Sequence, residues 1–139
     1  MAYTHYDALS VKTGGFAVGK KGSEVLVIDS NRNVIGKRIS SAVSVITAGA
    51  TPTLNCALGD VFTLTPGETE TISASNLTAG QRISLVITTS GATSYTLTFG
   101  TNFKSTGTLA TGVTTGKIFV VSFVSDGTNL SEVARTTAM

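Results

Sequence analysis

The chain has 139 residues and a net charge of +2, which suits one compact domain with a short appended module. Charged residues make up only 13% of it, and Ser and Thr, 39 in number, take their place. The small net charge gives no support for a nucleic-acid partner, and no apolar run approaches the roughly 20 residues that cross a bilayer, so we expect no membrane partner. Because β-branched Thr favours pleated strands and the residues typical of helix surfaces never cluster, the composition predicts an all-β protein.

The first 50 residues predict a small β-hairpin module. Residues 24–29 and 34–39 are strand-like, and the four polar residues 30–33 between them indicate a hairpin turn. Residues 16–18, between two Gly-rich stretches, predict one more short strand. Residues 47–52 are small and end in a proline, so they predict a linker to the remaining chain.

Charge divides the chain in the same way. Residues 1–50 hold six basic and three acidic side chains, whereas residues 51–139 hold four basic and five acidic ones. A basic segment favours docking on an acidic surface. The first residues lack the basic start and apolar core of a secretory signal peptide, so we expect synthesis in the cytosol without export by that route.

Residues 51–139 predict a second domain, an antiparallel β-sandwich or jelly-roll-like fold. Strand-like segments recur there, with turn residues between them, at spacings typical of such folds. In two of the segments apolar side chains alternate with mainly hydroxyl-bearing ones, which indicates a sheet buried on one face. The expected strands are residues 61–65, 69–74, 82–89, 95–99, 117–125 and 129–133.

One of these segments, residues 117–125, is apolar on both faces. A strand of this kind belongs in the middle of a sheet with cover on each side. We expect its second cover to come from the chain's own fold or from a neighbouring subunit.

No part of the sequence assembles the groups that catalysis needs. The only histidine, His5, stands near the chain end, and the eight acidic residues form no facing pair. Residues 29–33 resemble a calcium loop superficially, but Val34 stands where that loop has its glycine, so a hairpin turn explains them better. The single cysteine, Cys56, lies in an apolar stretch and is expected to be buried. The sequence therefore predicts a protein that is not an enzyme, with no cofactor and no metal ion.

Three turn motifs stand out in the second domain: Asn-Leu-Thr-Ala-Gly-Gln at residues 76–81, Phe-Gly-Thr-Asn-Phe-Lys at 99–104 and Phe-Val-Ser-Asp-Gly-Thr-Asn at 123–129. Together with residues 54–65 they resemble a β-domain of tailed-bacteriophage virion proteins. The resemblance covers about residues 51–139, and the family includes head decoration, head fibre and tail fibre proteins, commonly as trimers. Leu130 stands where an aromatic residue often follows the last motif in the family.

The resemblance implies a capsid decoration (cement) protein that binds the outer head surface and stabilises contacts between capsomers. The partners it implies are the major capsid protein and further copies of the chain in a homotrimer, and the location is the capsid surface of the virion, after synthesis in the bacterial host cytoplasm. A head- or tail-fibre domain that binds a host receptor or carbohydrate is the alternative, although aromatic residues for sugar stacking are few. The N-terminal segment is expected either to bind the capsid or to be an unstructured leader. The candidate capsid contacts are Tyr3, His5, Tyr6, Lys12, Lys20 and Lys21.

Overall fold

The computed structural model describes residues 16–18, 26–28, 34–36 and 41–139, and the chain divides into two compact units, Met1–Ser40 and Ser41–Met139. In the first unit, three short strands form an antiparallel sheet in which β2 is central. These strands are β1 (Phe16–Val18), β2 (Leu26–Ile28) and β3 (Val34–Gly36). The hairpin partners expected from the sequence are thus β2 and β3, and the turn between them lies outside the described residues.

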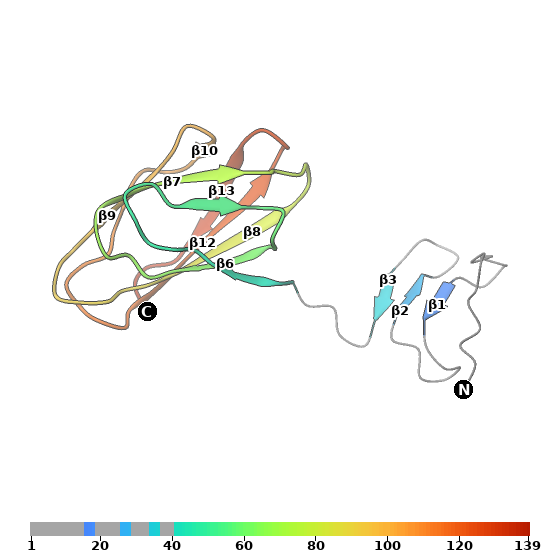
Figure 1. Cartoon of the computed structure of the whole chain (residues 1–139), viewed down its shortest axis with the longest axis horizontal. Coiled ribbons are helices and arrows are strands. Elements are labelled where there is room, and N and C mark those ends of the chain that lie inside the picture. Colours follow the sequence, from blue (N-terminus) through green and yellow to red (C-terminus); the bar gives the residue numbers. More distant parts are fainter. Residues whose placement is uncertain (1–15, 19–25, 29–33, 37–40) are drawn as a thin grey trace. The chain divides into compact units, whose positions relative to one another are not determined.

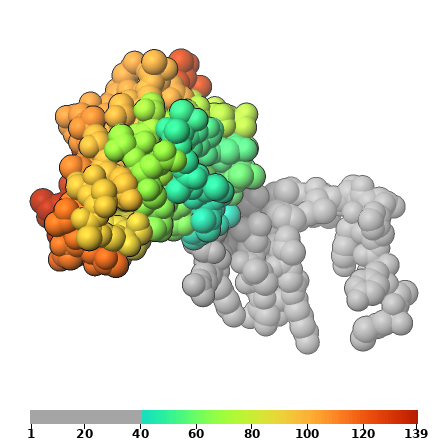
Figure 2. Space-filling view, turned by 60° about the vertical axis from the view of Figure 1, so that its left-hand side comes forward, coloured from blue at the N-terminus to red at the C-terminus, as the bar shows by residue number. Residues whose placement is uncertain are grey.

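The second unit is a β-solenoid of about three turns, and each turn contributes one strand to each of two sheets (Figure 1). The turns are β4 (Val43–Val45) with β5 (Thr53–Asn55), β6 (Val61–Leu64) with β7 (Glu70–Ser75), and β8 (Arg82–Thr88) with β9 (Thr96–Phe99). Strands of successive turns pair in parallel, β4 with β6 and β6 with β8 in one sheet, β5 with β7 and β7 with β9 in the other. Figure 2 shows the result as colours that follow one another across the unit, from teal through green and yellow to orange.

After the third turn the chain reverses direction. Strand β12 (Ile118–Ser125) pairs antiparallel with β8 and with β13 (Leu130–Arg135), and β10 (Phe103–Lys104) adds to β13 in parallel. Strand β11 (Leu109–Ala110) pairs antiparallel with β9. The unit therefore has a six-stranded sheet, in the order β10-β13-β12-β8-β6-β4, and a four-stranded sheet, in the order β11-β9-β7-β5.

The core lies between these two sheets. Side chains along each strand point alternately to opposite faces of a sheet, and in β8 and β12 every second residue is buried. Three phenylalanines pack against one another in the core, with ring centroids of Phe103 and Phe123 5.2 Å apart and of Phe99 and Phe123 5.7 Å apart. Aliphatic side chains from both sheets complete it: Ile46, Leu54, Leu64, Ile72, Ile83, Leu85, Ile87, Leu97, Leu109, Val121 and Leu130.

The prediction of an antiparallel β-sandwich or jelly-roll-like domain over residues 51–139 is wrong. The all-β character is correct, and no helix occurs in the described residues, but most neighbouring strands in the first three turns are parallel. The turns after β6 and β8 are corners that carry the chain to the other sheet, whereas a sandwich of hairpins would return it to the same one. Only β12 and β13 form the expected hairpin, across residues 126–129.

The boundary between the two units falls ten residues earlier than the sequence suggested. Strand β4 pairs in parallel with β6, with Val43 opposite Val61, so residues 43–45 form the first strand of the solenoid. Residues 47–52, expected to be a linker, form the corner between β4 and β5. Backbone hydrogen bonds join this corner to β7, because the N–H groups of Thr71 and Ser73 donate to the carbonyls of Ala50 and Pro52 at 2.8 and 2.9 Å.

Candidate interaction surfaces

The six-stranded sheet has one face in the core and one face outside it, which we call the outer face. Its residues alternate with the buried ones along each strand, and registered partners on neighbouring strands share it, as Thr63 shares it with Val86 and Val86 with Val120. The outer face consists of Val43, Val45, Val61, Thr63, Arg82, Ser84, Val86, Thr88, Lys104, Ile118, Val120, Ser122, Val124, Ser131 and Ala134.

No other strand of the second unit covers the outer face, because the only other sheet of that unit packs on the inner side. Val43 and Val45 on β4, the last strand of the sheet order, are 63% and 80% exposed, and Ile118 is 38% exposed. The remaining side chains of β6, β8 and β12 on this face, Arg82 excepted, are half-buried. The second apolar side of residues 117–125, predicted to be covered, is therefore uncovered within the second unit.

Charge is almost absent from the outer face. Arg82 on β8 and Lys104 on β10 are the ionisable side chains in it, both in the row of residues at one end of the sheet, and every other member is Val, Ile, Ala, Ser or Thr. Short, mostly β-branched side chains of this kind have few rotamers to lose when a partner covers them. The face carries no carboxylate, and away from that row it is uncharged.

The four-stranded sheet presents a different exterior. Its outward positions are mainly hydroxyl-bearing, with Thr53 registered opposite Ser73 and Thr71 opposite Thr98. The hydroxyls of Thr53 and Ser73 share a hydrogen bond of 2.7 Å. This side of the solenoid therefore satisfies part of its own hydrogen-bonding capacity and offers little apolar area.

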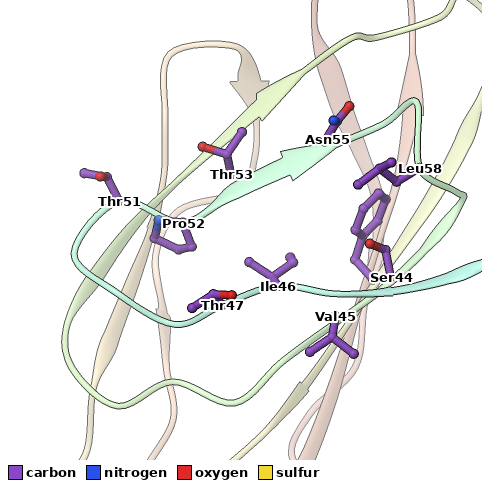
Figure 3. Close-up of a pocket in the computed structure, with 10 residues that line it drawn as sticks. Ser44, Val45, Ile46, Thr47, Thr51, Pro52, Thr53, Asn55 and Leu58 are labelled. Carbon is purple, nitrogen blue, oxygen red and sulfur yellow. The ribbon is translucent and has the colours of Figure 1, made fainter.

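A shallow hollow of about 350 Å³ lies at the first turn of the solenoid, between the segments of β4 and β5 (Figure 3). Ile46 and Pro52 lie across from each other in it, whereas Val45 points to the other side of its strand (Figure 3). The hollow exists because no described strand precedes β4 and β5 in their sheets. None of the residues that line the hollow is ionisable: Ser44, Val45, Ile46, Thr47, Thr51, Pro52, Thr53, Asn55, Leu58 and Phe62.

The three motifs of the family resemblance meet at one end of the solenoid. The N–H of Gly80 donates to the carbonyl of Ser125 at 2.8 Å, and Ser125 N–H donates to the Gln81 carbonyl at 2.9 Å. Asn102, in the remaining motif, binds residues that flank the other two: its Nδ2 donates to the Ala74 carbonyl at 2.7 Å, and its own carbonyl accepts from Leu130 N–H at 2.8 Å. These motifs, far apart in the sequence, therefore form one continuous structure.

The last of these motifs is a turn built around one carboxylate. Asp126 Oδ1 accepts the N–H groups of Asn129 and Thr128 at 2.6 and 2.7 Å, and these hydrogen bonds lower the pKa of Asp126. Gly127 has φ +93°, a conformation that favours glycine. The ionised carboxylate of Asp126 therefore stabilises the turn between β12 and β13.

Two other carboxylates are largely removed from solvent, with opposite consequences. Burial raises the pKa of Glu70, although the N–H of Gly49 donates to its Oε1 at 3.3 Å; its Oε2 is buried without a partner. Burial also opposes ionisation of Glu132, but hydrogen bonds from Arg135 and from Thr106 outweigh it and lower the pKa of Glu132. Neither carboxylate faces a second acidic group across a cleft, so the arrangement is structural.

Cys56 is buried and free, as the sequence predicted. Burial, followed by the nearby charge of Asp60, raises the pKa of its thiol, so the unreactive protonated form is favoured. Gln81 holds the surrounding loop, because its Nε2 donates to the Cys56 carbonyl and to Asp60 Oδ1, both at 2.8 Å.

The predicted capsid contacts, Tyr3, His5, Tyr6, Lys12, Lys20 and Lys21, all lie outside the described residues. The sequence indicated a second apolar face only for residues 117–125. It also predicted the strands β6 and β8, but not that they share this face, and it did not predict β4. Val43 and Val45 alternate with Ser44 and carried a usable signal, but residues 43–45 had been assigned to the N-terminal module. Within the part of the chain that the structure describes, no group of His, Cys, Asp and Glu could hold a metal ion, and no helix is long and apolar enough to cross a membrane.

The second unit is thus a short all-β solenoid with one sheet face that carries little charge and that no other strand of the unit covers. The whole chain matches no protein-family model, and no curated protein matches it. The resemblance to phage virion proteins therefore stays an expectation drawn from the residues.

Proposed function

We propose that this protein is a structural virion protein that decorates the outer surface of a bacteriophage head and stabilises contacts between capsomers. The observation that carries the proposal is the connection among the three motifs of the family resemblance. Ser125 and Asn102 tie them into one end of the solenoid by backbone and side-chain hydrogen bonds. A set of segments that depend on one another in this way supports a common domain more strongly than three separate turns would.

The physical character of the second unit also supports this proposal. A decoration protein needs a rigid body with surfaces that pack against other proteins. The solenoid has a continuous buried core, and its outer face is uncharged apart from Arg82 and Lys104. The exposed carboxylate of Asp126 holds a turn, and the buried carboxylate of Glu132 forms an ion pair with Arg135.

The experiment is to locate the protein on purified phage particles. Antibodies against residues 41–139, coupled to gold, are applied to intact particles, and the labels are counted on heads and tails by electron microscopy. We expect many labels per head and few on tails. Labelling confined to tails or to fibres would overturn the proposal.

A second arm tests the fibre alternative. The full chain is screened on a glycan array and against whole host cells. We expect no specific glycan and no saturable binding to cells, because Tyr95 is the only tyrosine in the described residues and the sequence has no Trp. Specific, saturable binding would favour a receptor-binding domain.

A further inference from the structure

We propose that the outer face of the six-stranded sheet is a self-association surface, on which the same face of a second copy of this chain packs. The inference rests on the geometry of β4, β6, β8, β12 and β13 and does not depend on where the protein is located on a particle. It adds to the proposed function a specific surface for contacts between copies.

The first step is the absence of cover. β12 is flanked on both sides, by β8 and by β13, and its inner residues Phe119, Val121 and Phe123 fill the core. Its outer residues are apolar as well, since Ile118, Val120 and Val124 all lie on the outer face. Strands with two apolar faces belong to sheets covered on both sides, yet within the second unit only the inner cover exists.

The second step is charge. A partner that differs from this chain would be expected to meet it with complementary charges, which give specificity and speed of encounter. The outer face offers two cations, Arg82 and Lys104, both in the row at one end of the sheet, and no carboxylate. The rest of the face is neutral and suits a partner surface that is itself neutral and rich in short apolar and hydroxyl side chains. The outer face of a second copy has that composition, and an antiparallel arrangement of the two faces keeps their cations apart.

The third step is size. Five strands spaced about 4.8 Å apart and roughly 20 Å long give a sheet face of about 500 Å² before side-chain relief is added. Two such faces would bury about 1,000 Å² in total, which is about the smallest area expected of a biological interface. We therefore expect weak association, with a dissociation constant in about the micromolar range. Two sheets stacked face to face, about 10 Å apart, are the expected geometry.

The fourth step concerns the exposed valines of β4, at the edge of the outer face. Val43 and Val45 are among the most exposed apolar side chains of the described chain. β4 ends the sheet order, and with three residues it offers only a short edge for pairing with another strand. A second copy across the outer face would cover both valines.

The experiment measures the mass of the full chain, 14.2 kDa as a monomer, by sedimentation velocity and by chromatography with light scattering over a range from micromolar to several hundred micromolar. We expect a concentration-dependent oligomer. Val86→Lys places a charge at the centre of the face, beside Thr63 and Val120. It is expected to weaken association about 100-fold, because the ammonium would be buried without a partner.

The matched control is Thr98→Lys, which introduces the same charge at a half-buried, outward position of the four-stranded sheet. Its dissociation constant is expected to stay within about threefold of that of the parent chain. If Val86→Lys does not fold, as judged by far-ultraviolet circular dichroism, Val45→Lys takes its place, because the 80% exposed Val45 tolerates a charge in the monomer.

A parent chain that stays monomeric at all concentrations would overturn the proposal, as would equal weakening by the Thr98→Lys control. Hydrogen exchange provides an independent measure. Amides of β4, including those of Val43 and Val45, are expected to exchange more slowly as the concentration rises, and unchanged exchange there would also overturn the proposal. A monomeric chain whose outer face is protected only on capsids would point instead to the capsid as the occupant, and would leave the proposed function standing.

Discussion

Arg135 on β13 reaches across to Phe99 on β9, so that its guanidinium carbon lies 5.2 Å from the centroid of the ring. The two residues belong to different sheets, and their contact joins the last strand of the chain to the third turn of the solenoid. The same guanidinium binds both carboxylate oxygens of Glu132, at 2.9 Å each, and donates to the carbonyls of Thr108 and Gly107 at 2.9 and 3.1 Å.

This arrangement predicts that Arg135→Lys destabilises the second unit by about 1–3 kcal/mol, because an ammonium cannot reproduce a planar fork that binds a carboxylate and stacks on a ring. The measurement is urea unfolding followed by circular dichroism. Arg82→Lys is the control, since Arg82 is exposed, and it is expected to change stability by less than about 0.5 kcal/mol. Equal effects of the two substitutions would contradict the role given to Arg135.

Glu70 predicts a pH dependence of stability. Its pKa is raised in the folded state, so the folded chain holds this proton to higher pH than the unfolded chain does. Stability from this group is therefore greatest below the ordinary Glu pKa and falls as pH rises from that value to the raised one. Glu70→Gln removes the penalty, and we expect it to be more stable than the parent at pH 7, with the difference closing on acidification.

Glu132→Gln is the control for Glu70, because the pKa of Glu132 is lowered in the folded state. The stability that this carboxylate contributes is present above the ordinary Glu pKa and is lost as pH falls through the lowered value. We expect Glu132→Gln to be less stable than the parent at pH 7. Both variants are compared by urea unfolding from pH 3 to pH 8, a range chosen roughly to span both pKa values. A destabilised Glu70→Gln at neutral pH would count against the effect assigned to burial.

The close approach of Gly100, at the end of β9, to the backbone of Ile72 leaves no room for a side chain. A Cβ added there would lie 2.9 Å from the carbonyl oxygen of Ile72, to which the Gly100 N–H donates at 2.8 Å. Gly100→Ala is expected to cost about 1–3 kcal/mol, since either the hydrogen bond or the strand spacing must give way. Gly91→Ala, with no atom within 4 Å of its added Cβ, is the matched control and should be nearly neutral. A thermal melt of both variants decides between these outcomes.

Phe123 predicts how strongly the core depends on its aromatic group. Its ring contacts those of Phe99 and Phe103, and its side chain is 1% exposed. Phe123→Ala is expected to destabilise the unit by about 3–5 kcal/mol, which is a large part of the total stability of a small domain. Val133→Ala, on the 59% exposed Val133, should cost less than about 0.5 kcal/mol. The midpoint of urea unfolding is the quantity to compare.

The sequence predicted where the strands lie better than how they pair. Ile83, Leu85 and Ile87 were expected on one face of a strand and are all buried in β8. Alternation of this kind has the same period in parallel and antiparallel sheets, so it carries no information on strand direction.

A regular repeat would have revealed the solenoid, but its turns differ in length. Val43 pairs with Val61, 18 positions later, whereas Val61 pairs with Ser84, 23 positions later. In the other sheet Thr53 pairs with Ser73 after 20 positions, and Glu70 pairs with Leu97 after 27. Solenoids are recognised in sequence by a fixed period, and loops of unequal length remove it here.

The candidate surface was predictable only in part, for a related reason. Residues 117–125 are apolar on both faces of the strand, and this alone indicated a strand that is covered on both sides. Val61, Val86 and Val45 become parts of one surface only when parallel pairing places them side by side, and that pairing was missing from the expected sandwich. The registered partners on these strands lie 18 and 23 positions apart in the sequence, with no local signal that links them.

The reversal of the chain at β12 gives the solenoid a direction of growth. At the β4 and β5 end, both strands that close the sheets run the same way as their neighbours, so a duplicated segment of about 20 residues could be inserted there as one more winding without changing any existing register. At the other end β12 runs against β8 and occupies the place of the next winding. Lengthened versions of this protein, natural or engineered, should therefore gain their extra windings ahead of residue 43.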